Sequence, residues 1–150
     1  MIIVAITDPH DPQATALLKQ SHALMESLFP PEDNFFLDID DLCADHIHFF
    51  TARIGDQIFG TGAVAMKDGY AEIKSMFVDK AARGKGIADA LLRQLEDTAR
   101  KADMPILKLE TGNVLHAAHK LYARHGYSNC GPFGDYAEAH SSVFMEKPLT

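Results

Sequence analysis

The sequence predicts one mixed α/β domain, with helices on both faces of a single sheet. Three observations support this prediction. Residues 46–78 contain three apolar-rich runs separated by turn residues at Gly55 and Gly69, a pattern typical of antiparallel strands joined by tight turns. Three other segments repeat apolar residues at helical spacing,. The length of 150 residues suits a single domain, residues 1–150, with a substantial core,.

The N-terminal part of the chain predicts a short strand followed by a long helix. Residues 2–7 are apolar and form the expected strand. Asp11 is the expected N-cap of the helix and Pro12 its first residue,. Pro30, followed by a second proline, ends the helix,. The expected inner face of this helix consists of Leu17, Leu18, Ser21, Leu24, Met25 and Leu28,.

An acidic segment and three strands come next. Residues 32–45 are expected to be irregular, with at most a short helix near residues 37–42. The three strands should form an antiparallel meander, because each turn brings the next strand back alongside the last. Their expected ranges are 46–54, 58–66 and 70–78.

The second half of the chain predicts two helices and three further strands. The helix that begins at Ile87 should direct five residues inward: Ile87, Leu91, Leu92, Leu95 and Ala99,. The helix over 114–125, which ends at Gly126, should bury Val114, Ala117, Ala118 and Leu121. The strands are expected at 106–111, 127–130 and 142–147. The predicted order is therefore β-α-(α)-β-β-β-α-β-α-β-β.

Composition and charge limit the kinds of partner. The net charge is −7, which argues against nucleic acid as a partner and is compatible with a cationic amine as substrate. Cys43 and Cys130 are far apart and in no metal-binding spacing, so we expect two thiols in a reducing cytoplasm. The N-terminus lacks the features of a signal peptide, and no apolar run reaches membrane-spanning length,. We therefore expect a cytoplasmic protein with no membrane partner.

The turn over residues 83–88 is the most informative feature of the sequence. It joins an apolar strand to an amphipathic helix and contains Gly84 and Gly86. Glycines allow close backbone approach, and the first N–H groups of a helix have no internal partner. The turn therefore predicts a site for a phosphate or pyrophosphate. It is not a P-loop, and Asp89 stands where a dinucleotide fingerprint needs its third glycine,.

Three motifs point to one protein family. Arg83, Gly86 and Ala88 form R-x-x-G-x-A. This pattern resembles the motif that grips the coenzyme A pyrophosphate in the GNAT superfamily of acyl-CoA-dependent N-acetyltransferases. Residues 121–127 carry the L-Y-x-x-x-G-Y pattern of a second family motif, and residues 132–136, P-F-G-D-Y, are similar to small bacterial-type members. The resemblance is specific over residues 70–147 and implies the GNAT fold, a mostly antiparallel sheet containing one splayed parallel pair of strands.

The resemblance implies acetyl-CoA as cofactor and a set of residues that bind it. The backbone of Met76 to Val78 would pair with the pantetheine arm and hold the thioester carbonyl. Arg83 and Lys85 would add positive charge near the pyrophosphate. Asn113 would bond pantetheine or, alternatively, cap the last helix. The residues expected at the cofactor are Met76, Phe77, Val78, Arg83, Gly84, Lys85, Gly86, Ile87, Ala88, Asn113 and Tyr122.

The expected reaction is direct attack of an amine on the thioester in a ternary complex. Glu72 is the first choice for general base, with Glu110 as its rival; alternatively, Glu72 is a surface carboxylate paired with Lys74. Period-two alternation predicts that Glu72, Lys74, Met76 and Val78 share one strand face. Tyr122 matches the family tyrosine that protonates the leaving thiolate, although a tyrosine packed in the core is the alternative.

The acceptor side is less well specified by the sequence. Asp135 and Tyr136 lie in a loop rich in glycine and proline and are the best candidates to contact an ammonium group, together with Glu110. The alternative is a β-turn in which Asp135 bonds local backbone. A small-molecule or peptide amine is expected, and its identity stays open, as does a homodimer. The eight histidines form only two close pairs with no third ligand, so no metal is expected. A non-catalytic acyl-CoA sensor is the alternative function.

Overall fold

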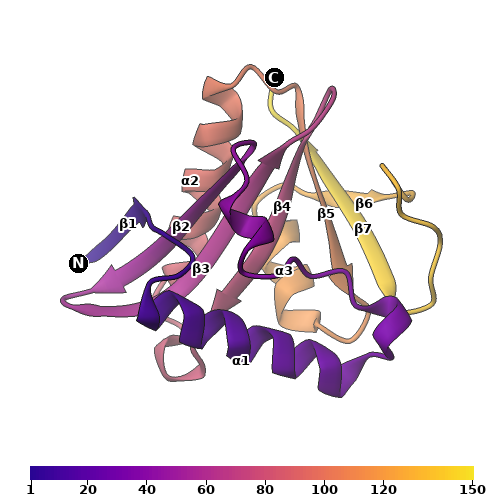
Figure 1. Cartoon of the computed structure of the whole chain (residues 1–150). Helices are drawn as coiled ribbons and strands as arrows, with labels where there is room; N and C mark the ends of the chain where they lie inside the picture. The colour runs from indigo at the N-terminus through magenta and orange to yellow at the C-terminus, as the bar shows by residue number, and fades with distance from the viewer.

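The computed structural model describes residues 1–150 and contains one seven-stranded sheet and three α-helices (Figure 1). The strands are β1 Ile2–Ile6, β2 Ile47–Ile54, β3 Gln57–Met66, β4 Ala71–Val78, β5 Ile106–Gly112, β6 Ser128–Cys130 and β7 Ser142–Pro148. The α-helices are α1 Pro12–Leu28, α2 Ile87–Lys101 and α3 His116–Arg124. Short 3₁₀ helices η1 Pro31–Asp33, η2 Asp41–Cys43 and η3 Lys80–Ala82 lie in the connections. The predicted order of elements is confirmed.

The sheet has the order β1-β2-β3-β4-β5-β7-β6 and is antiparallel except between β4 and β5. These two parallel strands pair only at their beginnings, where Ala71 lies opposite Leu107 and Glu72 opposite Lys108. Figure 1 shows them close together at one end and apart at the other. The predicted splayed parallel pair is therefore confirmed, and the backbone of β4 beyond Glu72 has no partner strand on the β5 side.

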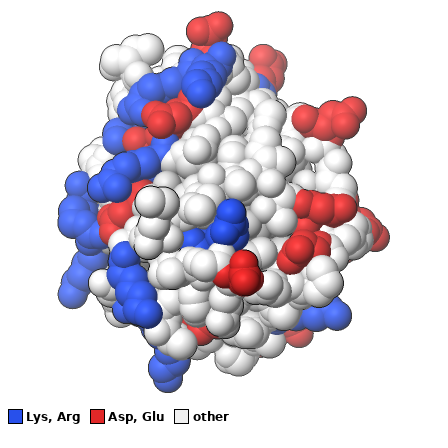
Figure 2. Space-filling view, turned by 90° about the vertical axis from the view of Figure 1, so that its left-hand side faces the viewer, with Lys and Arg blue, Asp and Glu red and all other residues white.

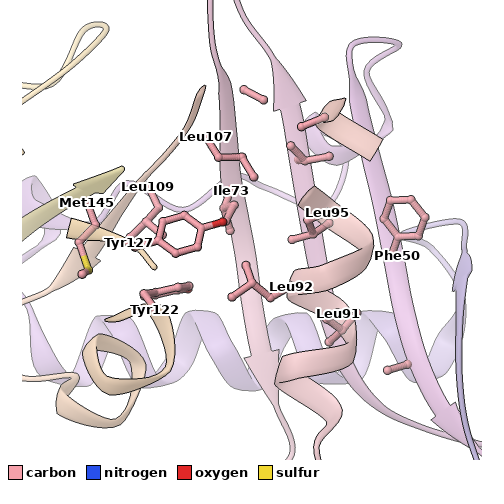
Figure 3. Close-up of a cluster of buried hydrophobic side chains, with 14 of the residues drawn as sticks. Phe50, Ile73, Leu91, Leu92, Leu95, Leu107, Leu109, Tyr122, Tyr127 and Met145 are labelled. Carbon is pink, nitrogen blue, oxygen red and sulfur yellow. The ribbon is translucent and has the colours of Figure 1, made fainter. Parts of the chain in front are cut away.

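Helices cover both faces of the sheet. On one face, α1 and η2 pack a small cluster that includes Leu18, Leu42 and Phe49. On the other face, α2 packs the main core, and Figure 3 shows Leu91, Leu92 and Leu95 pointing from α2 toward the sheet. Each of these three leucines is 0% exposed, and burying one contributes roughly 1.5–3 kcal/mol. All five residues predicted to face inward from α2 are buried.

Capping and close packing fix the two long helices. The Asp11 side chain accepts hydrogen bonds from the backbone N–H groups of Gln13 and Ala14, as the sequence predicts. On β3, a Cβ at Gly60 would lie 2.7 Å from Ile87 and one at Gly62 would lie 2.8 Å from the Met76 sulfur. The absence of side chains at these two positions therefore allows α2 and Met76 to approach the sheet.

A buried carboxylate joins α2 to the last strand. Glu96 is 4% exposed, and it accepts hydrogen bonds from the Tyr127 hydroxyl at 3.0 Å and the Lys147 ammonium at 2.9 Å. Arg100 lies 3.6 Å from the same carboxylate. Because the charge is paired and hydrogen-bonded, it is tolerated in the interior. Tyr127 is thus part of the framework that holds α2 against β7.

A bulge in β4 contradicts the prediction that Glu72, Lys74, Met76 and Val78 share one face. Ser75 has a φ of +56°, and the pairing with β3 shifts between Thr61 and Ala63. One extra residue in a strand reverses the facing of every residue after it. Met76 and Val78 consequently pack on the α2 face, while Glu72 and Lys74 face the side covered by α1.

The expected inner faces of α1 and α3 need two corrections. Leu28, the last residue of α1, is 43% exposed. Helix α3 begins at His116 rather than at residue 114, and Val114 is 48% exposed. Ala117 is also exposed. Both Val114 and Ala117 line an open groove rather than the core, so the apolar periodicity of this segment reflects a cavity wall instead of buried packing. No helix of the molecule combines the length and apolar character needed to cross a membrane.

Candidate active site

The turn before α2 presents a run of unpaired backbone donors. Gly86 has a φ of +84° and occupies the N-cap position of α2, a conformation that favours glycine. The backbone N–H groups from Gly84 to Asp89 make no hydrogen bond within the chain. Six successive free N–H groups at a helix N-terminus form a cradle for an anion.

An open groove of about 790 Å³ extends from this turn along the free end of β4. It lies between β4 with α2 on one side and α3 on the other, and Tyr122 is among its lining residues. The groove is lined by nine of the residues expected at the cofactor: Met76, Phe77, Val78, Arg83, Gly84, Gly86, Ile87, Ala88 and Tyr122.

Two residues expected at the cofactor do not line this groove. The Lys85 ammonium lies 5.9 Å from the centroid of the Phe59 ring. Asn113 donates its backbone N–H to the Ser141 carbonyl at 2.8 Å. Nor does Asn113 cap α3, because the N-cap position is Leu115 and no side chain caps it.

The surface charge is unevenly distributed over the face of the molecule that Figure 2 shows. Figure 2 shows Lys and Arg gathered mainly along one side and Asp and Glu mainly on the opposite side. The exposed basic residues of the turn and α2 are Lys80, Arg83, Lys85, Arg93, Arg100 and Lys101. A positive field beside the anion cradle favours a phosphorylated ligand.

Asp89 is the one carboxylate in the wall of the groove, and its charge is neutralised. Its Oδ1 atom accepts hydrogen bonds from Arg124 and His125, each at 2.7 Å. The hydrogen bond from His125, followed by the interactions with Arg124, lowers the pKa of Asp89. These contacts also tie the end of α3 to the beginning of α2 across the groove.

A smaller cavity of about 130 Å³, the inner cavity, lies where β4 and β5 diverge. It shares Met25, Met76, Leu115, Ala118 and Tyr122 with the groove, so the two spaces adjoin. Its polar lining includes Lys74, Ser75, Glu110, Thr111 and Tyr122. The side chain of Ser75 has no hydrogen-bond partner although it is buried.

Glu110 and Tyr122 are two titratable residues of the inner cavity whose pKa values are shifted. The Ser142 hydroxyl donates to the Glu110 carboxylate at 2.8 Å, but burial prevails and raises the pKa of Glu110. Burial, and then the Glu110 charge, raises the pKa of Tyr122. No hydrogen bond within the chain engages the Tyr122 hydroxyl. Tyr122 therefore stays protonated, with its hydroxyl available to a ligand.

Glu72 lies apart from the inner cavity, in a buried cluster with Lys74 and Tyr136. The Tyr136 hydroxyl donates to Glu72 Oε2 at 2.6 Å, and the Lys74 ammonium lies 3.6 Å from the same oxygen. Lys74 also donates to the Tyr136 hydroxyl and to the Phe35 carbonyl, each at 2.9 Å. Burial, and then the Glu72 charge, raises the pKa of Tyr136. Glu72 is thus paired with Lys74, but in the interior rather than at the surface.

Beyond this cluster lies a second, larger hollow of about 1030 Å³, the outer pocket. Glu72, Asp135 and Tyr136 line it. Asp135 is exposed and makes no hydrogen bond to local backbone, whereas the Tyr136 N–H donates to the Phe133 carbonyl in a turn. The two neighbouring residues therefore differ: the Tyr136 hydroxyl is hydrogen-bonded within the chain, whereas the Asp135 carboxylate is exposed to solvent.

Sequence reasoning missed the roles of Lys74, Ser75 and Phe35. A lysine in the middle of a mostly apolar strand was a usable signal for Lys74. Nothing in the sequence marks the positive φ of Ser75, or the contact of Phe35 with a strand about forty residues away. No three His, Cys, Asp or Glu side chains are grouped to hold a metal ion. His119 instead pairs with the Gly112 carbonyl at 2.8 Å.

Sequence comparison identifies relatives over nearly the whole chain. A model of the acetyltransferase (GNAT) family matches residues 13–127. A protein of Azospirillum brasilense named IAA acetyltransferase is 37% identical over 150 residues, covering 99% of this chain and 98% of the relative. The uncharacterized N-acetyltransferase YsnE of Bacillus subtilis is 35% identical over 149 residues, covering 97% and 99%.

Structural comparison agrees. A Klebsiella pneumoniae protein described as an acyl-CoA N-acyltransferase has a TM-score of 0.84 at 33% identity, covering 100% of this chain and 99% of that one. The PaiA N-acetyltransferase of Thermoplasma acidophilum, solved in complex with coenzyme A, shares the fold with a TM-score of 0.75 at 14% identity, covering 99% of each chain. The chain therefore belongs to the GNAT family and is an acetyltransferase with acetyl-CoA as its acyl donor.

Proposed function

We propose that this enzyme transfers the acetyl group of acetyl-CoA to a primary amine by direct attack in a ternary complex. One observation carries the proposal: the groove in which we place the cofactor adjoins the inner cavity, where Glu110 and Tyr122 are both present. Neither cysteine lines the groove or the inner cavity. This supports attack by the amine itself rather than through an acyl-cysteine intermediate.

We propose Glu110 as the general base in preference to Glu72. A base must reach the proton it removes, and Glu110 lines the inner cavity. Burial raises the pKa of Glu110 toward neutral pH. A general base is most effective when its pKa lies near the pH of the reaction. The Glu72 carboxylate is occupied by Tyr136 and Lys74, which supports a role in positioning the acceptor side of the site.

Tyr122 is the proposed proton donor to the departing thiolate. Its hydroxyl makes no hydrogen bond within the chain, and its raised pKa keeps it protonated,. The backbone of β4 at residues 76–78 has no partner strand on the β5 side. Its N–H groups are the proposed partners of the pantetheine amides and of the developing oxyanion.

We propose that the part of the acceptor outside its reactive amine carries no net negative charge. The outer pocket is lined by five carboxylates and by only two ammonium groups, those of Lys67 and Lys74; the carboxylates belong to Asp40, Asp41, Asp68, Glu72 and Asp135. An acidic surface raises the local concentration of a cation. Both cysteines are free thiols, which supports a reducing, cytoplasmic setting.

The test is release of coenzyme A thiol from acetyl-CoA in the presence of primary amines. Tyr122→Phe should lower kcat by about 10²-fold, within the range of a general acid, and leave the affinity for acetyl-CoA unchanged by thermal shift. Unchanged turnover would remove Tyr122 from the mechanism. Acetyl-CoA binding without thiol release for any amine would instead favour a sensor of acyl-CoA.

A further inference from the structure

The inner cavity and the outer pocket share one wall. Phe35, Phe36 and Lys74 line both spaces. The ring of Tyr136, which lines only the outer pocket, packs edge-on against Phe35 with centroids 5.3 Å apart at 84°. The Phe35–Tyr136 ring pair therefore stands between the space where transfer would occur and a much larger open hollow.

This wall is assembled from two segments that are far apart in the sequence. Phe35 lies between η1 and η2, and Tyr136 lies between β6 and β7. Lys74, on β4, donates to the Phe35 carbonyl and to the Tyr136 hydroxyl at 2.9 Å each. Glu72 accepts from Tyr136 and lies beside Lys74. A single buried ammonium thus holds both sides of the wall to the sheet.

The inner cavity is too small for a whole acceptor. A dry protein cavity of about 150 Å³ accommodates one benzene molecule, and the inner cavity is about 130 Å³. The acetyl group and the attacking amine would use most of that volume. In a ternary complex the cofactor occupies the groove on the other side, so the remainder of the acceptor needs a different space.

We propose that Phe35 and Tyr136 form an acceptor gate: the amine reaches the inner cavity past their rings while the body of the acceptor lies in the outer pocket. This rests on the proposed function and names the acceptor class, a primary amine on a slender, unbranched arm that bears a larger body. Lys74 is a positioning residue, because it acts by holding the two gate residues.

The first experiment requires no turnover. Thr111, 8% exposed, lines the inner cavity. Thr111→Cys is made in a background with Cys43→Ser and Cys130→Ser, and the groove is filled with S-methyl coenzyme A, which has no free thiol. The rate of labelling by benzyl methanethiosulfonate is then compared with the rate of labelling by the smaller methyl methanethiosulfonate. Adding Phe35→Ala should speed the benzyl reaction about tenfold or more, since local opening governs how fast buried groups react.

A matched control removes a ring elsewhere. Phe59 is partly buried and lines neither space, so Phe59→Ala should leave the ratio of benzyl to methyl labelling rates unchanged. An equal ratio in the parent, Phe35→Ala and Phe59→Ala proteins would overturn the gate, whatever the enzyme's activity. A higher ratio in Phe35→Ala alone would support it.

The second experiment uses acetyl transfer to propylamine and to the bulkier benzylamine. Phe35→Ala should raise kcat/KM for benzylamine relative to propylamine by about tenfold or more, the scale on which pockets discriminate size, with an unchanged KM for acetyl-CoA. Tyr136→Phe keeps the ring but loses both hydroxyl contacts, and should shift the same ratio by less. A ratio that moves in neither variant overturns the gate. No transfer to any amine by the unsubstituted enzyme would instead refute the proposed function, and the labelling result would then decide the gate alone.

Discussion

The proposed donor side and the proposed acceptor side of the site are built in different ways. The donor side is made of backbone: six successive N–H groups from Gly84 to Asp89 and the unpaired edge of β4. The acceptor side is made of side chains that meet from distant parts of the chain, as when Tyr136 reaches Glu72 and Lys74. A backbone cradle tolerates side-chain change, whereas a side-chain cluster changes shape with each substitution. Substitutions on the acceptor side can therefore alter the acceptor preference of this enzyme while it keeps the same donor.

The largest effect is expected when the proposed base, Glu110, is removed, because it lies where the donor side and the acceptor side meet. Glu110→Gln should lower kcat/KM by about 10²–10⁴-fold, the usual contribution of a general base. Because burial raises the pKa of Glu110 above its ordinary value of 4.5, activity should fall as the pH decreases through that raised pKa. The pH profile of the variant should lack this acidic limb.

The control for Glu110→Gln is the affinity for acetyl-CoA, which a change on the acceptor side should leave intact. A variant with normal activity and a normal acidic limb would return the role of base to Glu72.

The second test breaks the acceptor side at its buried charge pair. Lys74→Met leaves Glu72, whose side chain is 6% exposed, without its cation, and should cost about 3–5 kcal/mol of unfolding free energy. The double variant Lys74→Met/Glu72→Gln should recover much of that loss. Thermal unfolding measures both. Lys67→Met, at an exposed position of the outer pocket, is the matched control and should change little. Failure of the double variant to recover stability would show that the pair is not the source of the loss.

The third test introduces backbone strain into the donor side. Gly86→Ala places a Cβ on a residue at φ +84°, which costs about 1–2 kcal/mol. The distorted turn should weaken acetyl-CoA binding about tenfold, since ~1.4 kcal/mol corresponds to that factor. Gly131→Ala, at a glycine with open surroundings and no positive φ, should have no effect in the same titration. Equal affinities would show that the cradle does not depend on this conformation.

The smallest expected effect concerns the link across the groove. Asp89→Asn should cost less than about 1 kcal/mol, because the pairing lies near the surface. The pKa of Asp89 is lowered in the fold, so its contribution is present above the ordinary value of 3.8 and is lost as the pH falls through the lowered pKa. The difference in melting temperature between the two proteins should shrink toward zero on acidification. A constant difference would show that the charge of Asp89 does not stabilise the fold.

The same contrast explains what could be predicted from the sequence. The turn before α2 is local, so R-x-x-G-x-A and the strand before it were sufficient to indicate the groove. The five inward residues of α2 followed from helical periodicity. The bulge at Ser75 could not be predicted, because a serine does not mark a positive φ. The predicted sheet face of Met76 and Val78 was therefore wrong. The contacts of Lys74 with Phe35 and Tyr136 join residues 39 and 62 positions apart, beyond the reach of local patterns.

The bulge also limits how β4 can evolve. Deleting Ser75 would restore regular alternation, and every later residue of the strand would change faces. Phe77 would turn toward α2, while Met76 and Val78 would leave the core they now contact. Lineages descended from this enzyme should therefore accumulate substitutions along β4 far more readily than insertions or deletions of one residue.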